Sequence, residues 1–201
     1  MENSGITTAM VRIEGASPLL MHNGQLANPL NEWTMKIKEI TSKHHTKKTD
    51  ADEMELRRLE FQGGLYYDED KKAPMIPDVL IEGTIRDAAR GKKKGPAVTA
   101  GLNVYPEKIP LIYKGTKDRD GLYEDRNFVD NRMVKLQKSA SLVRTRPRFD
   151  KWELEFEIKT IDEILSMKEV ADFLATAGTF KGIGDYRPKF GRFIVKEFEV
   201  V

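Results

Sequence analysis

The sequence predicts an α+β protein with a ferredoxin-like or RNA-recognition-motif core, in which the elements follow the order βαββαβ. The clearest sign is residues 152–160, where apolar side chains alternate with Glu153, Glu155 and Glu157, as in a strand buried on one face. Two apolar stripes with helical spacing, over 78–90 and 163–177, predict the helices. The remaining strands are expected at 6–14, 111–115 and 193–200.

Each boundary has a local reason. Gly15 ends the first strand, and Asp78 is expected to cap the first core helix. The run Gly91-Lys-Lys-Lys-Gly95 stops that helix and leads into a cationic loop. Gly178 stands where the C-terminal glycine of the second core helix is expected.

Two insertions interrupt this order within a single domain that spans residues 1–201. Residues 22–73 form a partly helical insertion after the first strand, and Asp50 or Asp52 is expected to cap its second helical piece. A hairpin with a charged tip is expected over 65–76. Residues 116–150 form a basic, extended insertion before the third strand.

Composition limits the class of protein. A chain of 201 residues with 39% hydrophobic and 33% charged residues is typical of a soluble globular domain. No apolar stretch reaches the roughly 20 residues of a membrane span, and the first residues lack the features of a signal peptide. The absence of cysteine excludes disulfides and thiolate metal sites. We therefore expect a cytoplasmic protein without membrane contact.

Charge placement limits how this chain could bind nucleic acid. The net charge is only +2, so binding would depend on where the charges lie. RNA-recognition-motif sheets stack bases on aromatic side chains of the open face, but Glu153, Glu155 and Glu157 would make this face acidic. Any nucleic acid is therefore expected to bind to loops and insertions.

Cations do gather in the loops. Residues 86–94 carry Arg86, Arg90, Lys92, Lys93 and Lys94 against Asp87 alone. Residues 130–151 carry Arg132, Lys135, Lys138, Arg144, Arg146, Arg148 and Lys151 against two aspartates. In Arg144-Thr-Arg-Pro-Arg148 the arginines would lie about 6.6 Å apart on one side of an extended backbone, a spacing that suits successive phosphates. The alternative is an edge strand protected by solvated charge.

A glycine-rich stretch over 178–192 lies between the last helix and the last strand. It combines glycines, aromatic rings and cations: Gly178, Gly182, Gly184, Gly191, Tyr186, Phe190, Lys181, Arg187, Lys189 and Arg192. Glycines at this density allow close approach to another chain or to a phosphate, and the cations suit an anion. The alternative is a helix-to-strand connection whose charges are solvated.

Motifs of common enzymes are absent from the sequence. It contains no Walker-type phosphate loop, no Gly-x-Ser-x-Gly and no His-Glu-x-x-His. His44 and His45 are adjacent, a spacing that favours neither a metal site nor a general base. Asp50, Asp52 and Asp68 fit capping or solvated carboxylates better than nuclease residues. We expect no catalytic residue, no metal and no cofactor.

Three motifs resemble the RAMP superfamily, the repeat-associated backbone and processing subunits of CRISPR complexes. Ser17-Pro-Leu-Leu-Met-His-Asn-Gly24 is similar to the family's Pro-Leu turn that leads to a glycine. Pro74-Met-Ile-Pro-Asp-Val-Leu-Ile-Glu-Gly-Thr-Ile-Arg86 resembles its Tyr-Ile-Pro-Gly-Ser-Ser-Leu-Lys-Gly-x-x-Arg motif. The stretch 178–192 resembles its C-terminal glycine loop. These motifs touch both ends and the middle of the chain, in the family's order.

The resemblance implies a modified RNA-recognition-motif core with a thumb-like insertion at 22–73, and copies that stack along a single-stranded guide. It nominates Gly83 and Arg86 in the helix motif, and in the loop Lys181, Gly182, Gly184, Arg187 and Gly191. Asp78 replaces the first glycine of the helix motif, and a carboxylate at a helix N-terminus opposes phosphate binding there. The chain is short for a backbone subunit, which favours a stand-alone relative such as a phage-encoded one. The resemblance thus implies a location in a bacterium or a phage-infected host cell.

We expect a non-enzymatic protein that binds single-stranded RNA or DNA and self-associates along the strand, with a CRISPR-like complex as a further partner. The expected nucleic-acid-binding residues are Arg86, Arg90, Lys92, Lys93, Lys94, Arg132, Arg144, Arg146, Arg148, Lys181, Gly182, Gly184, Tyr186, Arg187 and Lys189. Tyr186, Phe190 or Trp33 would stack on bases. Two alternatives stay open: a protein-interaction module that mimics or inhibits a CRISPR backbone assembly, and a metal-independent RNA endonuclease that uses His44 or His45.

Overall fold

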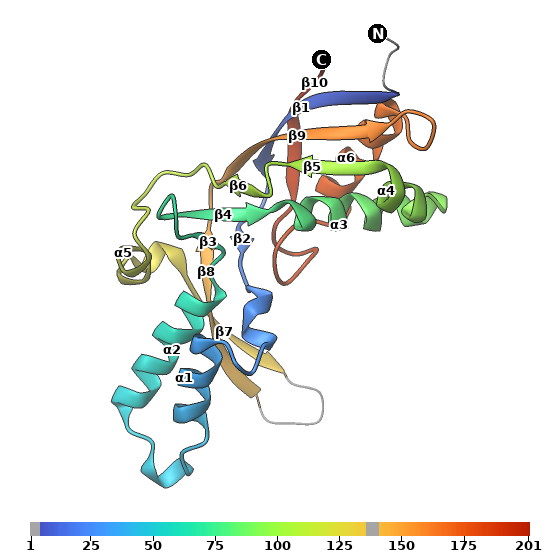
Figure 1. The fold of residues 1–201 in the computed structure, drawn as a ribbon. Helices are drawn as coiled ribbons and strands as arrows, with labels where there is room; N and C mark the ends of the chain where they lie inside the picture. Colours follow the sequence, from blue (N-terminus) through green and yellow to red (C-terminus); the bar gives the residue numbers. More distant parts are fainter. Residues whose placement is uncertain (1–4, 136–140) are drawn as a thin grey trace. The chain divides into compact units, whose positions relative to one another are not determined.

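The computed structural model describes residues 5–135 and 141–201 (Figure 1). The chain forms two compact units. Unit 1 contains the chain up to Leu19, Tyr67–Lys114 and Asp150–Val201, and unit 2 contains Leu20–Tyr66 and Gly115–Phe149. The α+β class that the sequence predicts is confirmed, since both units combine helices with antiparallel strands.

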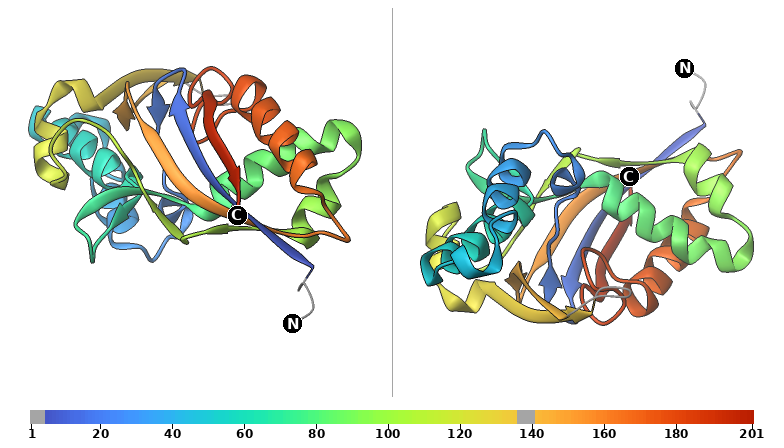
Figure 2. Two further views of the ribbon diagram at one scale, coloured as in Figure 1. Left: turned by 90° about the horizontal axis from the view of Figure 1, so that it is seen from above. Right: turned by 90° about the horizontal axis from the view of Figure 1, so that it is seen from below.

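Unit 1 is built on a four-stranded antiparallel sheet in the order β10-β1-β9-β5. Its strands are β1 (Ile6–Gly15), β5 (Leu102–Tyr105), β9 (Glu153–Ile161) and β10 (Phe193–Val200). Along the chain, helix α3 (Asp78–Ala89) lies between β1 and β5, and α6 (Met167–Phe180) lies between β9 and β10. In Figure 2, α3 passes behind the sheet in one view and in front of it in the other.

Alternating burial shows which sheet face is packed. In β9, Leu154, Phe156 and Ile158 are buried, whereas the glutamates between them are half-buried or exposed, as the sequence predicts. The helices contribute their own buried stripes, Ile81, Ile85 and Ala89 in α3 and Val170, Phe173 and Leu174 in α6. Apolar burial stabilises such a core by about 25 cal/mol per Å². The helices therefore cover one face of the sheet, and the other face stays open.

The second core strand is β5, and the prediction of a core strand over 111–115 is wrong. After α3 the chain forms a 3-10 turn, η3 (Arg90–Lys92), and a short helix, α4 (Gly95–Gly101), which runs directly into β5. Leu102 and Val104 are the buried, alternating side chains of this strand. In the segment 111–115, which the structure describes in full, an isolated bridge joins Ile112 to Glu153.

Helix ends in unit 1 differ from the expected positions. Asp78 is the first residue of α3 and not its N-cap, and its Oδ1 accepts a hydrogen bond from Val79 N at 2.6 Å. Helix α6 continues through Gly178 because this glycine packs against β10, where a Cβ would lie 2.3 Å from Phe193 O. The left-handed residue after the helix is Gly182, with φ of +71°. Gly178 is therefore a packing glycine.

A smaller sheet in unit 1 joins β3 (Tyr67–Asp68), β4 (Ala73–Pro77) and β6 (Lys108–Pro110). Strands β3 and β4 form the hairpin with a charged tip that the sequence predicts. Asp68 is buried, and its Oδ1 accepts a hydrogen bond from Lys108 Nζ at 3.2 Å. Burial alone would raise the pKa of Asp68, but Lys108 and two backbone N–H groups lower it. Asp68 is thus a structural carboxylate.

Unit 2 contains a helical hairpin. Helices α1 (Glu32–Thr41) and α2 (Asp50–Gly64) flank a 3-10 turn, η2 (His45–Lys47), and η1 (Gly24–Ala27) precedes them. They pack through Ile40, Leu56 and Leu59, with Trp33 and Ile37 against this cluster. The two helical pieces expected from the sequence are confirmed. The N-cap of α2 is Thr49, however, and Asp52 closes its capping box.

Unit 2 also contains a β-hairpin of β7 (Val129–Lys135) and β8 (Ser141–Phe149). Strand β2 (Leu19–Leu20) is the third strand of this sheet. The segment expected as an extended basic insertion also holds a helix, α5 (Arg119–Glu124), and a 3-10 turn, η4 (Arg126–Phe128). Asp118 caps α5 by accepting a hydrogen bond from Gly121 N at 2.8 Å.

Candidate nucleic-acid interface

Three motifs that lie far apart in the chain meet in unit 1. Pro18 O accepts a hydrogen bond from Gly191 N at 2.8 Å, which joins the first motif to the glycine-rich loop. Thr84 Oγ1, in the helix motif, donates a hydrogen bond to Gly182 O at 2.9 Å. The motifs on which the family resemblance rests therefore form one structural site.

The glycine-rich loop is held together by its own backbone. Gly182, Gly184 and Gly191 have φ values of +71°, +77° and +72°, a region that favours glycine. Ile183 N donates a hydrogen bond to Gly191 O at 2.9 Å, and a Cβ on Gly191 would lie 1.8 Å from Ile183 O. Gly182 and Gly191 are buried and serve this internal approach, whereas Gly184 is half-buried. Of the three, Gly184 is the one best placed for an external ligand.

Arg187 joins the loop to α3. Its Nη1 donates hydrogen bonds to Thr84 Oγ1 at 3.2 Å and to Gly182 O at 3.4 Å. The same nitrogen lies 3.7 Å from Asp87 Oδ2. Because the Arg187 side chain is still 39% exposed, it can contact a ligand while it holds the loop.

Two hollows with shared walls lie at this junction. The larger, of about 760 Å³, is lined by side chains that include Asp87, Arg90, Phe180, Lys181, Tyr186 and Arg187. The smaller, of about 200 Å³, shares Asp87, Gly184 and Arg187 with it and adds Gly83 and Arg86. Both residues nominated in the helix motif thus lie next to the nominated residues of the loop.

Two exposed aromatic rings line the larger hollow. Tyr186, which the sequence nominates, is 45% exposed, and Phe180 is 67% exposed. Phe180 is not among the residues that the sequence nominates, although it is the first aromatic residue of the glycine-rich stretch and directly precedes Lys181. Phe190 is buried, at 6% exposure, and packs edge-on against Tyr186. The prediction that Phe190 could stack on a base is therefore wrong.

The cations near the hollows differ in how strongly they are already bound. Arg90 Nη1 lies 3.0 Å from Asp87 Oδ1, and Lys94 Nζ lies 3.2 Å from Glu169 Oε1. Lys92 Nζ stands over the ring of Phe173, 5.6 Å from its centroid. Within residues 5–135 and 141–201, no carboxylate lies within ion-pair distance of the exposed cations Arg86, Lys93, Lys181 and Lys189.

The arginine row of β8 lies in unit 2. Arg144, Arg146 and Arg148 share one side of the strand, as their spacing predicts, because the residues between them are buried. Arg144 Nη1 lies 2.5 Å from Glu60 Oε1, and Arg148 Nη1 lies 3.5 Å from Asp130 Oδ1. Arg132 also pairs with Asp130, at 2.8 Å. Both carboxylates are buried, so part of the row neutralises them. Lys138, from the same basic segment, lies outside the described residues.

Comparison with known proteins finds likeness in structure alone. No protein-family model and no curated protein matches the sequence. The chain is similar to a chain in the cryo-EM structure of the Type III-B Cmr-beta bound to cognate target RNA, with a TM-score of 0.55 and 15% identity. The chain therefore shares its fold with that chain. At this identity the likeness concerns the fold alone.

The coverage of that match is unequal. It includes 98% of this chain but 61% of the other, so this chain spans about three fifths of the length of its neighbour. A crystal structure of Cmr6 from Pyrococcus furiosus is also matched, at 12% identity and a TM-score of 0.36, over 96% of this chain and 99% of that one.

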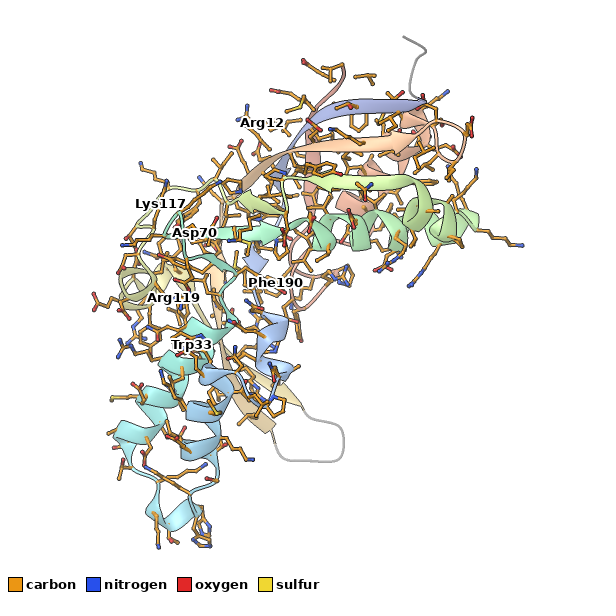
Figure 3. All side chains as sticks on the ribbon, in the orientation of Figure 1. Arg12, Trp33, Asp70, Lys117, Arg119 and Phe190 are labelled. Atoms are coloured by element: carbon orange, nitrogen blue, oxygen red, sulfur yellow. The ribbon has the colours of Figure 1, made fainter. Side chains whose placement is uncertain are left out.

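Trp33, a further stacking candidate, belongs to unit 2 and lies beside Arg119 (Figure 3). Arg119 Cζ is 5.3 Å and Lys36 Nζ is 5.1 Å from the centre of its ring. Gly63 packs against the same side chain, since a Cβ on Gly63 would lie 2.9 Å from Trp33 Cβ. Trp33 is half-buried and already contacts cations of its own unit, so we expect it to support unit 2.

The histidine pair lies at the exposed tip of the α1–α2 hairpin, with ring centroids 4.3 Å apart. His44 Nδ1 accepts a hydrogen bond from Thr46 N at 3.4 Å, which caps η2. In the described part of the chain, no group of three or more His, Asp or Glu side chains is placed to hold a metal ion. Asp52 pairs with Lys43 at 2.6 Å, and this hydrogen bond, together with those from Thr49, lowers the pKa of its carboxyl.

No described helix has the length and apolar character needed to cross a bilayer.

Proposed function

We propose that the chain is a non-enzymatic protein that binds single-stranded nucleic acid at the glycine-rich loop and α3. The observation that carries this proposal is the pair of adjoining hollows. There Arg86 and Lys181, which have no carboxylate partner among the described residues, lie with the exposed rings of Phe180 and Tyr186. Proteins that bind single strands without sequence preference combine cations, which contact the phosphates, with exposed aromatic rings, on which the bases stack.

The two kinds of side chain have different tasks. A guanidinium such as that of Arg86 or Arg187 can donate two parallel N–H groups to one phosphate. An aromatic ring gains about 1–3 kcal/mol for each base that stacks on it. Asp87 repels phosphate but orients Arg90 and Arg187 by charge. The phosphates are therefore expected nearest to Arg86 and Lys181, with bases toward Phe180 and Tyr186.

The proposed core is ferredoxin-like. Its four sheet strands and two helices follow βαββαβ along the chain, and the sheet order β10-β1-β9-β5 with antiparallel neighbours fits such a core. The glycine-rich loop then connects the second core helix to the last strand. On this basis, the two segments of unit 2, which include most of 22–73 and 116–150, are insertions into one RAMP-like domain.

RNA is the first ligand to test, because the neighbour with a TM-score of 0.55 is a chain in a structure of Cmr-beta bound to cognate target RNA. We propose further that copies of the chain associate along one strand, and that a CRISPR-like complex is a possible setting for this assembly. The sheet face would take no part in holding phosphates, because its glutamates repel them.

Anisotropy of short labelled RNA and DNA oligonucleotides tests the proposal. The double variant Arg86→Ala/Lys181→Ala should weaken binding by about a hundredfold, since each cation lost from a phosphate contact costs about 1.4 kcal/mol. Lys117→Ala/Lys168→Ala is the matched control, because it removes the same charge from exposed residues that do not line the hollows. Equal affinities of the two double variants, or no binding of the wild type at low salt, would reject the proposal.

A protein-interaction module is the second candidate function. It is favoured by the arginine row, in which Arg144 and Arg148 neutralise buried carboxylates of unit 2 and so offer less free charge than the sequence suggests. Such a module would mimic or inhibit a CRISPR backbone assembly. It predicts that inhibition of the assembly persists in Arg86→Ala/Lys181→Ala, whereas a nucleic-acid-dependent activity would be lost with binding.

A further inference from the structure

The open face of the four-stranded sheet is acidic in the described strands. The strand register places six glutamates on it: Glu14, Glu153, Glu155, Glu157, Glu197 and Glu199. The cations on the same face are Arg12, Lys159 and Lys196. Six carboxylates against three cations leave a net charge of −3 on this face.

Ion pairs within the face leave this excess in place. Arg12, on the side of the sheet away from α3 (Figure 3), lies 2.6 Å from Glu153, 3.6 Å from Glu155 and 3.5 Å from Glu197. This clustering raises the pKa of Arg12, chiefly through the hydrogen bond to Glu153. Lys159 and Lys196 are bound to Glu157 and Glu14, each at 3.0 Å. Every cation of the face is thus already neutralised, Arg12 by its nearest partner Glu153, and Glu155, Glu197 and Glu199 carry the surplus.

Apolar side chains lie among these charges. Met10, Tyr105 and Ile194 are 46%, 45% and 49% exposed on the open face. An exposed surface that mixes large apolar groups with an excess of one sign of charge is typical of a protein-binding surface. It does not suit nucleic acid, which the carboxylates repel.

Two exposed lysines follow helix α3, on the covered side of the sheet. The turn η3 follows α3, the helix that packs on the covered face of the sheet, and presents Lys92 and Lys93 as exposed residues. No carboxylate lies within ion-pair distance of either lysine in the described ranges. Because the acidic face and this turn point to opposite sides of the sheet layer, they cannot meet within one copy.

We propose that the acidic sheet face of one copy docks against the η3 turn of a second copy. Such a contact is heterologous, because the sheet face of one copy meets the η3 turn of the next. The association therefore continues head to tail instead of closing as a dimer. The inference deepens the self-association in the proposed function by assigning its surfaces. It requires no nucleic acid for the contact itself.

Charge-reversal variants test this contact. Their association is measured by light scattering on protein that is free of nucleic acid. Glu155→Lys/Glu199→Lys makes the sheet face basic, and Lys92→Glu/Lys93→Glu makes the turn acidic. Each variant alone should be monomeric at a concentration at which the wild type associates, because like charges then face each other. An equimolar mixture should associate again, since every contact between the two variants joins opposite charges. Glu163→Lys/Asp172→Lys, with the same charge change at exposed residues outside the face, should associate as the wild type does.

The inference is overturned if the mixture stays monomeric, or if the wild type is monomeric at low salt. Wild-type association that does not weaken with added salt would also overturn it, and this measurement does not depend on any variant folding. Failure here is distinct from failure of the proposed function. Binding of an oligonucleotide too short for two copies should be unchanged in Glu155→Lys/Glu199→Lys, and it tests the hollows alone.

Discussion

Two structural features require glycine at position 191. Its φ of +72° favours glycine, and a Cβ would lie 1.8 Å from Ile183 O, a backbone atom that cannot move aside. Its backbone N–H also donates a hydrogen bond to Pro18 O. The residue therefore fixes how the glycine-rich loop returns to the start of the chain.

Gly191→Ala should lower the free energy of unfolding by about 2–3 kcal/mol, because the strain falls on the backbone. Urea denaturation measures this change. Gly91→Ala is the control, since a Cβ there meets no atom within 4 Å. Equal stability of the two variants would contradict the constraint described for Gly191.

Phe180→Ala tests the second exposed ring of the larger hollow. The loss of one stacked base should weaken oligonucleotide binding by about 1–3 kcal/mol. Stability should change little, because the side chain is 67% exposed. Met54→Ala provides a control of equal exposure, at 68%, in unit 2. Unchanged binding in Phe180→Ala, measured by anisotropy, would remove this ring from the site.

The cationic and glycine residues of the candidate site can be predicted from the sequence, because residue type and spacing identify them. The side chains that they contact cannot be predicted in this way, because those contacts depend on the tertiary structure. Nothing near Arg187 in the sequence indicates that Thr84 binds it, and Glu60 lies 84 residues from Arg144. The arginine spacing predicts a shared strand side correctly but cannot show that buried carboxylates lie beside it.

At the scale of elements, long and regular patterns are predictable and short ones are not. The alternation along β9 extends over nine residues and indicates both its type and its buried face. Strand β5 has four residues, too few for periodicity to distinguish it from the loop that follows the lysine run. Helix α6 was expected to end at Gly178 because a packing glycine and a capping glycine have the same sequence signal.

The contact between α2 and β8 includes a buried carboxylate. Glu60 is buried, accepts a hydrogen bond from Thr145 N at 2.9 Å and pairs with Arg144. Arg144→Ala would leave this carboxylate without its cation and should destabilise the protein by about 3 kcal/mol.

Adding Glu60→Gln to Arg144→Ala should recover part of that stability, because the buried charge is then removed. Urea denaturation of the single and double variants measures the difference. If Arg144→Ala unfolds like the wild type, the pair with Glu60 is not structural, and the arginine is available for phosphate after all.

The start of α6 should show a pH dependence. Hydrogen bonds from Lys94 and from Ser166 lower the pKa of Glu169 in the folded protein. A carboxyl whose pKa is lowered by folding stabilises the protein above its unfolded pKa, and this contribution is lost as the pH falls through the folded value. Between about pH 5 and pH 3, the wild type should therefore lose more stability than Glu169→Gln. Thermal unfolding across this range measures it, and Glu163→Gln should follow the wild type.

At the scale of the whole molecule, placement of charge matters more than its sum. A net charge of +2 predicts weak general attraction to a polyanion. The acidic open sheet face and the cations near the glycine-rich loop lie on separate surfaces of unit 1, and the arginine row belongs to unit 2. The alternation along β9 correctly predicts that the open sheet face is acidic. The division of the chain into two compact units can be recognised only from contacts between residues far apart in the sequence.

The salt dependence of binding counts the phosphates that the protein holds. On single strands, the logarithm of the observed affinity falls with the logarithm of salt concentration by about 0.7 for each phosphate contact. Arg86, Lys181 and Arg187 at the hollows predict a slope of about −2, and Arg86→Ala should make it shallower by about 0.7. A slope of about −5 or steeper that Arg86→Ala leaves unchanged would transfer phosphate binding to other cations, with the arginine row of β8 as the first to test. Anisotropy titrations at several salt concentrations distinguish these outcomes, because a single patch and two patches differ in slope even where their affinities coincide.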